Sequence, residues 1–327
     1  MNLSVRLATI CFLLLLALVT VGLALSSGTY GSDPIAAWQS MSGGDPMTRE
    51  VVVSLRLPRV LAAFGCGSLL ALGGALLQAL LRNPLADPFV LGISGGAGAF
   101  ALLAMYFGVA VVGVAVAGIA GALISTFLLF GLAWRAGLVP LRLLLGGVIL
   151  SSIWGAVVTL LLAVAPDAPL RGMVFWLMGD LSGVAPERAW IPLLVAIIAL
   201  LPAWVLARGF DAMGQGETTA AALGVPVFRL RVAALVMAAV ITALVVITAG
   251  SIGFIGLVTP HLLRLAGLRR HRQLLPACVI AGGTLLLAAD TIARTIVAPH
   301  QLPVGAITAA IGAPVFLWLL ARSNPRP

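Results

Sequence analysis

Long apolar stretches, almost free of charged residues and separated by short polar breaks, make up most of the sequence. Six of them have room for one helix each, at about residues 7–25, 60–81, 142–163, 189–207, 274–289 and 305–320. Two longer stretches, 88–134 and 232–263, have room for two helices each. A helix needs roughly 20 apolar residues to cross the hydrocarbon core of a bilayer. The pattern therefore predicts an all-α integral membrane protein of ten transmembrane helices, with one domain over residues 1–327.

Glycine-rich breaks mark where the two longer stretches turn. We place one turn near Gly108–Gly113 and another break around Gly250–Gly256, because glycine weakens a helix. The apolar piece Met173–Met178 is too short to cross a bilayer and is interpreted as a re-entrant half-helix. Residues 27–55 are polar and rich in glycine, which predicts an external loop. A cleaved signal peptide is the alternative for residues 7–25, but their length and the absence of a clear Ala-x-Ala site favour an uncleaved span.

A single residue type carries the basic charge. Hydrophobic residues make up 61% of the chain and charged residues 9%, and the net charge of +9 rests on arginine alone because lysine is absent. Without lysine the chain cannot hold a Walker-type phosphate loop or form a Schiff base. Any ATP-driven step must therefore use another chain. The arginines form no stripe with aromatic residues, so no nucleic-acid partner is expected.

The distribution of arginine sets the orientation in the membrane. With ten passes and a cytoplasmic N-terminus, thirteen arginines fall in the cytoplasm and six outside. Positive residues are enriched in cytoplasmic loops, so this orientation is favoured over its reverse. It places both the N- and the C-terminus in the cytoplasm.

One polar segment, Arg208–Arg231, interrupts the apolar pattern for longer than any turn requires. Its alanines predict a short helix over Gln215–Leu223, with Gly224 as the C-terminal cap and Pro226 as the stop. The orientation places this segment in the cytoplasm. It is interpreted either as a contact surface for another protein or as an ordinary solvated loop.

Arginines at the external ends of the helices run against the positive-inside pattern. Arg56 and Arg59 stand one turn apart before the second span, and Arg294 closes the ninth. Long side chains at a membrane edge can reach water on their own. A cluster of them is better suited to pairing with carboxylates of a partner protein.

Candidate residues for catalysis are few. The three histidines form no pair on one helix face, and no His-Glu-x-x-His motif is present. Asp180 and Asp290, near helix ends, are candidates for a proton relay or for structural salt bridges and helix ends. We therefore expect a protein that is not an enzyme.

Several long motifs follow one another along the chain, namely Arg56-Leu-Pro-Arg59, Gly74-Ala-Leu-Leu-Gln-Ala-Leu-Leu-Arg-Asn-Pro-Leu-Ala-Asp-Pro88, Phe175-Trp-Leu-Met-Gly-Asp180, Leu223-Gly-Val225, Gly253-Phe-Ile-Gly-Leu-Val-Thr-Pro-His261 and Leu302-Pro-Val-Gly-Ala-Ile-Thr308. Together they resemble the FecCD-type permeases, the membrane subunits of type II ABC importers for iron chelates, haem and cobalamin. The resemblance covers nearly the whole chain. It departs from the family at Gln301, where a glutamate is common, so a role that needs a charge there is in doubt.

The resemblance implies partners and site residues. It implies a homodimer that sits on two ATPase subunits and receives cargo from a periplasmic or lipid-anchored substrate-binding protein. The coupling segment would be residues 209–230, docking into the ATPase through Gln215, Gly216, Glu217, Thr218, Ala221, Leu223, Gly224 and Val225. Binding-protein docking would use Arg56, Arg59 and Arg294, and the pathway would lie at the dimer interface, along spans five and ten. The cytoplasmic gate would be Val139, Pro140 and Leu141.

The function implied is that of a multi-pass permease of the bacterial inner membrane. It would carry an iron-siderophore or haem to the cytoplasm by alternating access, with cobalamin as the alternative cargo. No cofactor or metal is expected on this chain, because ATP and magnesium would be held by the partner ATPase. A proton-coupled secondary transporter is a more distant alternative.

Overall fold

The computed structural model describes residues 3–28, 46–89, 91–134 and 138–322, and every regular element in these ranges is a helix. Seven helical stretches are long and apolar enough to cross a membrane, and three shorter apolar helices accompany them. The seven contain α1 (Leu3–Ser26), α4 (Leu57–Leu81), α6 (Val111–Trp134), α7 (Pro140–Val164), α9 (Ile191–Gly214), α11 (Val227–Ala249) and α13 (His271–Thr295). The shorter three are α5 (Ile93–Tyr106), α12 (Ile255–Leu265) and α14 (Val304–Arg322). The all-α membrane fold is confirmed, whereas the count of ten crossings stays a prediction.

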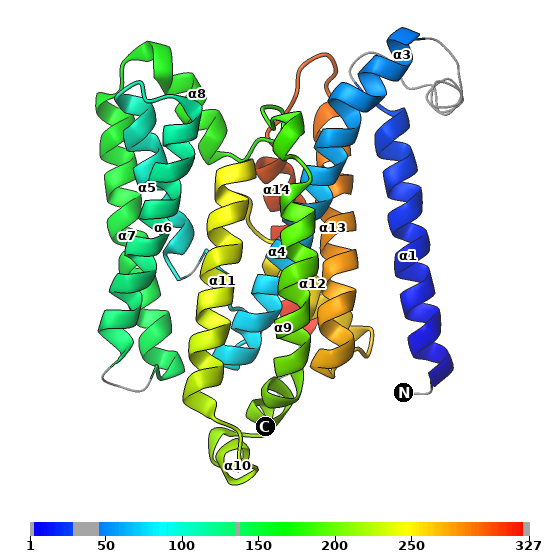
Figure 1. Ribbon diagram of the computed structural model, residues 1–327, viewed down its shortest axis with the longest axis vertical. Coiled ribbons are helices and arrows are strands. Elements are labelled where there is room, and N and C mark those ends of the chain that lie inside the picture. The colour runs from blue at the N-terminus through cyan, green and yellow to red at the C-terminus, as the bar shows by residue number, and fades with distance from the viewer. Residues whose placement is uncertain (1–2, 29–45, 90, 135–137, 323–327) are drawn as a thin grey trace.

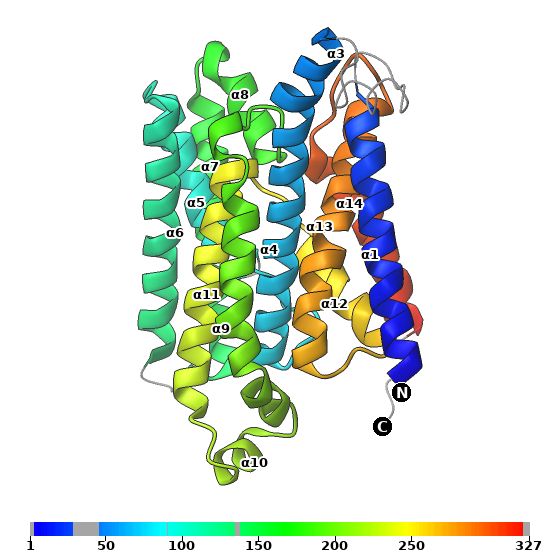
Figure 2. The same ribbon diagram turned by 45° about the vertical axis from the view of Figure 1, so that its right-hand side comes forward.

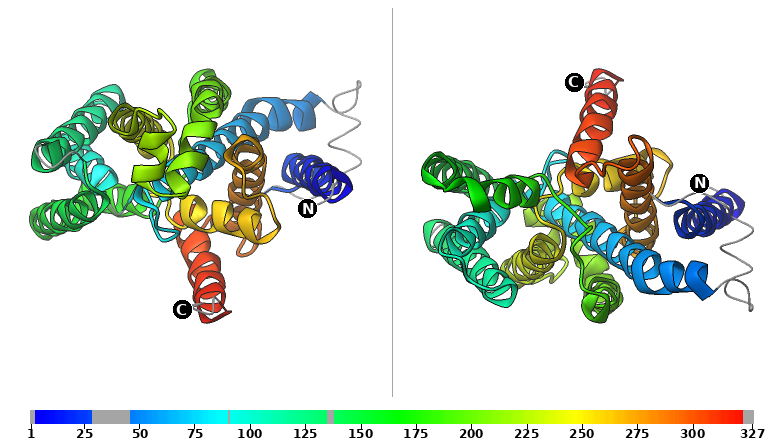
Figure 3. Two further views of the ribbon diagram at one scale, coloured as in Figure 1. Left: turned by 90° about the horizontal axis from the view of Figure 1, so that it is seen from below. Right: turned by 90° about the horizontal axis from the view of Figure 1, so that it is seen from above.

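Helix α4 forms the centre of the bundle. Almost all of its side chains are buried, and it packs against α13, α9, α11 and α12 (Figure 3). Helices α5, α6 and α7 form a group on one side, and α1 stands on the opposite side against α13 (Figure 1). A helix that is apolar all round can lie in a protein core or face lipid. Helix α4 lies in the core, whereas the equally apolar α1 and α7 are mostly exposed.

Close packing around α4 depends on backbone-to-backbone contact. A Cβ atom added at Gly74 would lie 2.0 Å from the carbonyl oxygen of Gly256, at the start of α12. Small residues let helices approach in lipid, where no hydrophobic effect drives them together. The same explanation holds for α5 and α6, where a Cβ atom at Gly96 would lie 2.6 Å from the carbonyl oxygen of Gly121. Gly96 and Gly121 thus let α5 and α6 pack closely.

The turns expected from glycine lie where the sequence placed them. Helix α5 ends at Tyr106 and α6 begins at Val111. Helix α11 ends at Ala249 and α12 begins at Ile255, with residues 250–254 between them. Most of the short apolar piece expected at Met173–Met178 belongs to α8 (Asp167–Leu177), an 11-residue helix that begins earlier and ends one residue before Met178. Asp167 lies in its first turn, where a negative charge is favourable.

The external loop predicted over residues 27–55 is wrong for its second half. Residues 46–56 are helical, as α3 (Pro46–Glu50) and the π-helix η1 (Val51–Arg56), and they continue directly into α4. The polar side chains that suggested a loop face outward from this extension, while Val52 is buried. Residues 29–45 lie outside the described part of the chain.

The helices define two ends of the molecule. Helix α10 (Glu217–Ala222) projects beyond the bundle at one end, and α8 lies at the other (Figure 2). Helix α1 begins and α14 ends on the side where α10 projects. We refer to these as the α10 end and the α8 end. Their placement in cytoplasm and exterior stays a prediction.

Candidate functional site

The polar segment expected to contact another protein forms a compact turn at the α10 end. Helix α9 continues past its expected end at residue 207 and stops at Gly214. The expected short helix is α10, and Gly224 follows it with a φ of +78°, so its role as C-terminal cap is confirmed. The chain then restarts at once as α11, for which Pro226 is the N-cap residue.

An inward-facing carboxylate fixes α10 to the bundle. The Oε1 atom of Glu217 accepts hydrogen bonds from the guanidinium of Arg231 and, at 3.5 Å, from Nη2 of Arg82. Arg231 is buried, and Glu217 is about one-third exposed. Ala220 packs fully buried beneath the helix. Glu217 thus joins α10 to α11 and to the end of α4, and it acts as a positioning residue.

The opposite face of the segment is open. Gln215, Thr218, Ala221, Leu223 and Gly224 are exposed, whereas Gly216, Glu217 and Val225 are half-buried. Leu223 is 69% exposed although it lies beyond the apolar helices. A single exposed leucine is common on protein surfaces, so the contact role of this face stays a prediction. We call the five exposed residues the coupling surface.

A second brace holds the α10 end together. Oδ1 of Asp211, near the end of α9, accepts the backbone N–H of His271 at 3.0 Å and lies 2.7 Å from its Nδ1. The carboxylate therefore caps the first turn of α13. Sixty positions separate the two residues, and no local pattern indicated the pair.

The two motifs around residues 74–88 and 253–264 pack against each other. Nε2 of Gln78 donates to the carbonyl oxygen of Leu257 at 3.1 Å, and its Oε1 accepts from Arg264. In the turn after α4, Oδ1 of Asp87 accepts the N–H of Phe89 at 2.9 Å. Burial raises the pKa of Asp87 to about 6. These motif residues thus fix α12 against α4.

The residues assigned to the gate begin α7, at the α10 end. Pro140 starts the helix, as proline commonly does. Val139 and Leu141 are 42% and 64% exposed in the single chain. They form an apolar edge suited to contact with a second copy or to closing a pathway. Their role as a gate stays a prediction.

At the α8 end, Arg59 and Arg294 flank a fully buried carboxylate. Nε of Arg59 lies 3.0 Å from both oxygens of Asp290, and Nη2 lies 2.8 Å from Oδ1. Nε of the buried Arg294 lies 3.8 Å from Oδ2. This pairing of α4 with α13 agrees with the salt-bridge interpretation of Asp290. Neither arginine is a freely extended surface group.

Arg56, Arg59, Arg294 and Asp290, which we call the arginine cluster, also hold the end of α1. The last carbonyl groups of a helix have no partner within the helix. Nη1 of Arg56 donates to two of them, at 2.9 and 2.8 Å, and Nη2 of Arg294 donates to a third at 2.6 Å; the acceptors are Leu25, Ser26 and Ala24. The structure thus brings together Arg56, Arg59 and Arg294, as expected. It also gives them partners within the chain, and docking stays a prediction.

A polar hollow, which we call the mouth pocket, lies beside this cluster. Its volume is about 300 Å³, and its lining comprises Phe175, Asp180, Ser182, Gln301, Leu302 and Pro303. Gln301 also accepts a hydrogen bond from Nη1 of Arg59 at 2.7 Å. The mouth pocket and the arginine cluster therefore share one side chain. No local sequence pattern links Asp180 to Gln301, which are 121 positions apart.

Glycines allow the backbones around the mouth pocket to cross. Gly250 has a φ of +69°, and a Cβ atom there would lie 2.2 Å from the carbonyl oxygen of Trp176. A Cβ atom at Gly305 would lie 2.2 Å from the carbonyl oxygen of Met178. The end of α8, the end of α11 and the start of α14 thus meet in direct backbone contact.

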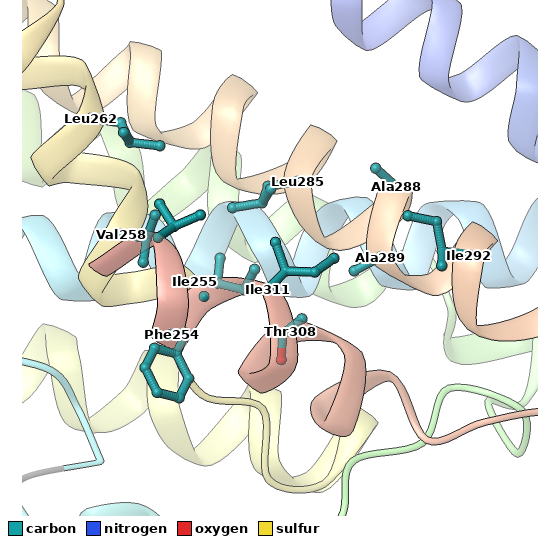
Figure 4. Close-up of a pocket in the computed structure, with 12 residues that line it drawn as sticks. Phe254, Ile255, Val258, Leu262, Leu285, Ala288, Ala289, Ile292, Thr308 and Ile311 are labelled. Carbon is teal, nitrogen blue, oxygen red and sulfur yellow. The ribbon is translucent and has the colours of Figure 1, made fainter. Parts of the chain in front are cut away.

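A separate apolar cavity of about 180 Å³ lies between α12, α13 and α14 (Figure 4). Phe254, Val258, Leu285 and Ile311 are among its lining residues, and the one polar group, Thr308, bonds back to its own helix at Gly305. The lining offers no charged group or ion ligand. Elsewhere too, within the described ranges, no three His, Cys, Asp or Glu side chains gather to hold a metal ion.

Comparison with known proteins identifies a matching family and several similar proteins. The model of a family described as the FecCD transport family matches residues 14–322. The vitamin B12 import system permease protein BtuC of Klebsiella pneumoniae subsp. pneumoniae is 42% identical over 321 residues, covering 96% of this chain and 93% of that protein. The protein of the same name from Citrobacter koseri is 41% identical over 325 residues, covering 97% and 94%.

A solved structure is similar over the whole bundle. It is described as a metal-chelate type ABC transporter in an inward-facing conformation, and it matches with a TM-score of 0.86 at 30% identity. The match covers 97% of this chain and 99% of that chain. The arrangement of helices is therefore that of an ABC importer permease.

Proposed function

The chain belongs to the FecCD transport family and is a permease subunit of an ABC importer, and we propose that its cargo is vitamin B12 or a closely related corrinoid. The observation that carries this proposal is the 42% identity to a vitamin B12 permease over 96% of the chain. The similar metal-chelate transporter stands at 30%. The relatives thus favour cobalamin, the alternative cargo, over the iron-siderophore or haem expected first.

The chain lies in the inner membrane as a multi-pass protein, and its partners follow from its class. An importer of this class uses separate ATPase subunits and a substrate-binding protein. We propose a homodimer with two ATPase subunits, which hold ATP and magnesium. The coupling surface docks into the ATPase, so the α10 end and both termini are cytoplasmic. ATP binding and hydrolysis move the turn around α10, and the pathway opens alternately to either side while the permease itself changes no covalent bond.

Transport by the reconstituted complex tests the cargo. In proteoliposomes that contain the permease and its ATPase, with ATP inside and loaded binding protein outside, labelled cyanocobalamin is expected to accumulate. A ferric hydroxamate siderophore and haem are expected to give uptake near background. The proposal is wrong if an iron chelate accumulates and cobalamin does not. Cobalamin uptake that persists without ATP would instead favour a proton-coupled carrier.

Docking of the binding protein is proposed at the arginine cluster. Arg56 and Arg59 are not fully buried at the α8 end, although only 11% of the Arg59 side chain is exposed. Arg294 is 3% exposed, so it adds positive charge to the cluster without reaching the surface. Carboxylates of a partner would meet the net positive charge of three arginines around one aspartate.

Arg56 offers a test of docking that spares the buried pair. Arg56→Gln keeps amide donors for the carbonyl groups of α1 and removes the charge. Association of the binding protein is expected to slow several-fold at low salt, because charges at an interface rim act mainly on encounter. Arg49→Gln, two turns earlier on the same helical extension and exposed, is the matched control. Equal association rates for the two variants, measured by surface plasmon resonance on the complex in nanodiscs, would contradict docking at Arg56.

A further inference from the structure

We propose that the mouth pocket is a cargo-contact site that accepts a carboxamide side chain of the corrinoid and disfavours a carboxylate at the same place. This inference rests on the proposed function, and it assigns Asp180 as a residue that determines specificity.

The position of the pocket places it on the route of the cargo. Its residues come from α8, from the turn after α8 and from the turn before α14. Helix α8 directly follows α7, and α7 and α14 correspond to spans five and ten, which are expected to line the pathway. The arginine cluster proposed to dock the loaded binding protein lies one hydrogen bond away, through Gln301. A cargo released at the α8 end therefore meets this pocket as it enters.

The polar groups of the pocket define the chemistry of its ligand. Oδ1 of Asp180 accepts the N–H of Ser182 at 2.8 Å, and Oδ2 accepts its hydroxyl at 2.5 Å. Each carboxylate oxygen can accept a second hydrogen bond. The half-buried carboxylate thus keeps acceptor capacity toward the pocket, and Phe175, Leu302 and Pro303 add apolar surface. A group with N–H donors and a short apolar stem satisfies both features.

The volume fits a side chain of the cargo better than its ring. At about 300 Å³, the pocket holds a propionamide arm, whereas a whole corrin macrocycle is several times larger. Corrinoids carry acetamide and propionamide arms around the ring. Haem carries carboxylate arms, which the negative charge of Asp180 would repel. Arg59 contacts Gln301 and Arg171 contacts the ring of Phe175, but neither arginine lines the pocket, where Asp180 is the charged residue. The pocket therefore separates the two kinds of cargo by the sign and donor capacity of their arms.

The backbone around Asp180 makes the acceptor rigid. The N–H of Asp180 donates to the carbonyl oxygen of Ala249 at 2.9 Å, and the glycine crossing at Gly250 and Gly305 fixes the turn on both sides. A preorganised acceptor loses little entropy when it binds, which favours discrimination between similar ligands.

The test compares cobalamin with its monocarboxylic acids, in which one peripheral carboxamide is hydrolysed. Initial uptake into proteoliposomes is measured with saturating loaded binding protein, so that the ratio of the two rates reports on the permease. Asp180→Asn keeps the shape and an acceptor for the N–H of Ser182 but removes the charge. We expect the preference for the amide over at least one isomeric acid to fall roughly tenfold. Asp167→Asn, which removes the same charge at the exposed start of α8, is expected to leave the ratio unchanged.

A second variant gives an effect of opposite sign. Ser182→Ala removes the hydroxyl that donates to Oδ2 and leaves that oxygen available to the cargo, so the amide preference is expected to rise about twofold. Normal cobalamin uptake with an unchanged ratio in both variants, for every isomer, overturns the site but not the proposed cargo. Absence of cobalamin uptake by the unmodified protein overturns both.

Discussion

Asp290→Asn is expected to lower the stability of the permease by about 3 kcal/mol. The carboxylate is fully buried between α4 and α13, where Arg59 and Arg294 both direct guanidinium groups toward it. Asparagine keeps the shape but supplies no charge, so two largely buried cations lose their counter-ion. Desolvation makes an unpaired buried charge costly, whereas an intact pair contributes little net stability. Thermal unfolding of the permease–ATPase complex in nanodiscs measures the loss as a lower midpoint.

Two controls show whether the lower midpoint comes from the broken Arg59–Asp290 pair or from the loss of any acidic charge at this end. Glu187→Gln changes an exposed acid in η2 (Pro186–Arg188) at the same end and is expected to leave the midpoint unchanged. The double variant Arg59→Gln with Asp290→Asn is expected to recover part of the loss, because one of the two unpaired cations is gone. An unchanged midpoint for Asp290→Asn together with lost uptake would instead support a proton relay through Asp290.

The ion pair between Arg59 and Asp290 makes Arg59 unsuitable for testing where the binding protein docks. Reversing the charge of Arg59 would place a second carboxylate against Asp290, and like charges at that distance disfavour each other strongly in a buried site. Loss of binding-protein stimulation in such a variant would reflect a damaged bundle as readily as a lost contact. Arg56, whose contacts are carbonyl groups at the end of α1, is the informative position.

The sequence predicts the helices well because burial in lipid demands an unbroken apolar run. Its errors lie where helices extend beyond that run. Helix α9 continues seven residues past residue 207 to Gly214, and α13 begins three residues before residue 274, at His271. In both extensions polar side chains pair with one another, as Asp211 and His271 do. Hydropathy alone cannot distinguish such a polar helical extension from a loop. For the same reason the helical residues Pro46–Arg56 were predicted to be part of a loop.

Local chemistry predicted the short helix α10 but not the contacts that hold it. Three alanines, a glycine and a proline were enough to place α10 and its cap. The bond between Glu217 and Arg231 spans fourteen positions and depends on how α10 folds back on α11. The bond between Arg59 and Asp290 spans 231 positions and depends on the whole bundle. Neither bond leaves a periodic signal in the sequence. The resemblance implies an ATPase contact for Glu217, and this stays a prediction beside its bond to Arg231.

Leu223→Asp is expected to abolish ATP-driven uptake while leaving the permease folded. The side chain is 69% exposed on the coupling surface. Burying a leucine against a partner stabilises a complex by about 2 kcal/mol, and placing a charge in the same interface would weaken it at least about thirtyfold. Co-purification of the ATPase and ATPase stimulation by loaded binding protein measure the effect. Thermal unfolding of the isolated permease is expected to be unchanged, because Leu223 makes little contact within the chain.

Variants of Glu217, which positions α10, are expected to behave differently from variants of Leu223, which is proposed to contact the ATPase. Glu217→Arg would set a cation against Arg231 and Arg82, so it is expected to displace α10, weaken ATPase association and lower the unfolding midpoint together. Leu265→Asp, at the last residue of α12 and 63% exposed, is the matched control at the same end and is expected to retain the ATPase. An intact, stimulated complex with Leu223→Asp would show that the ATPase docks elsewhere. Equal loss with Leu265→Asp would show that the whole α10 end, rather than the turn around α10, carries the contact.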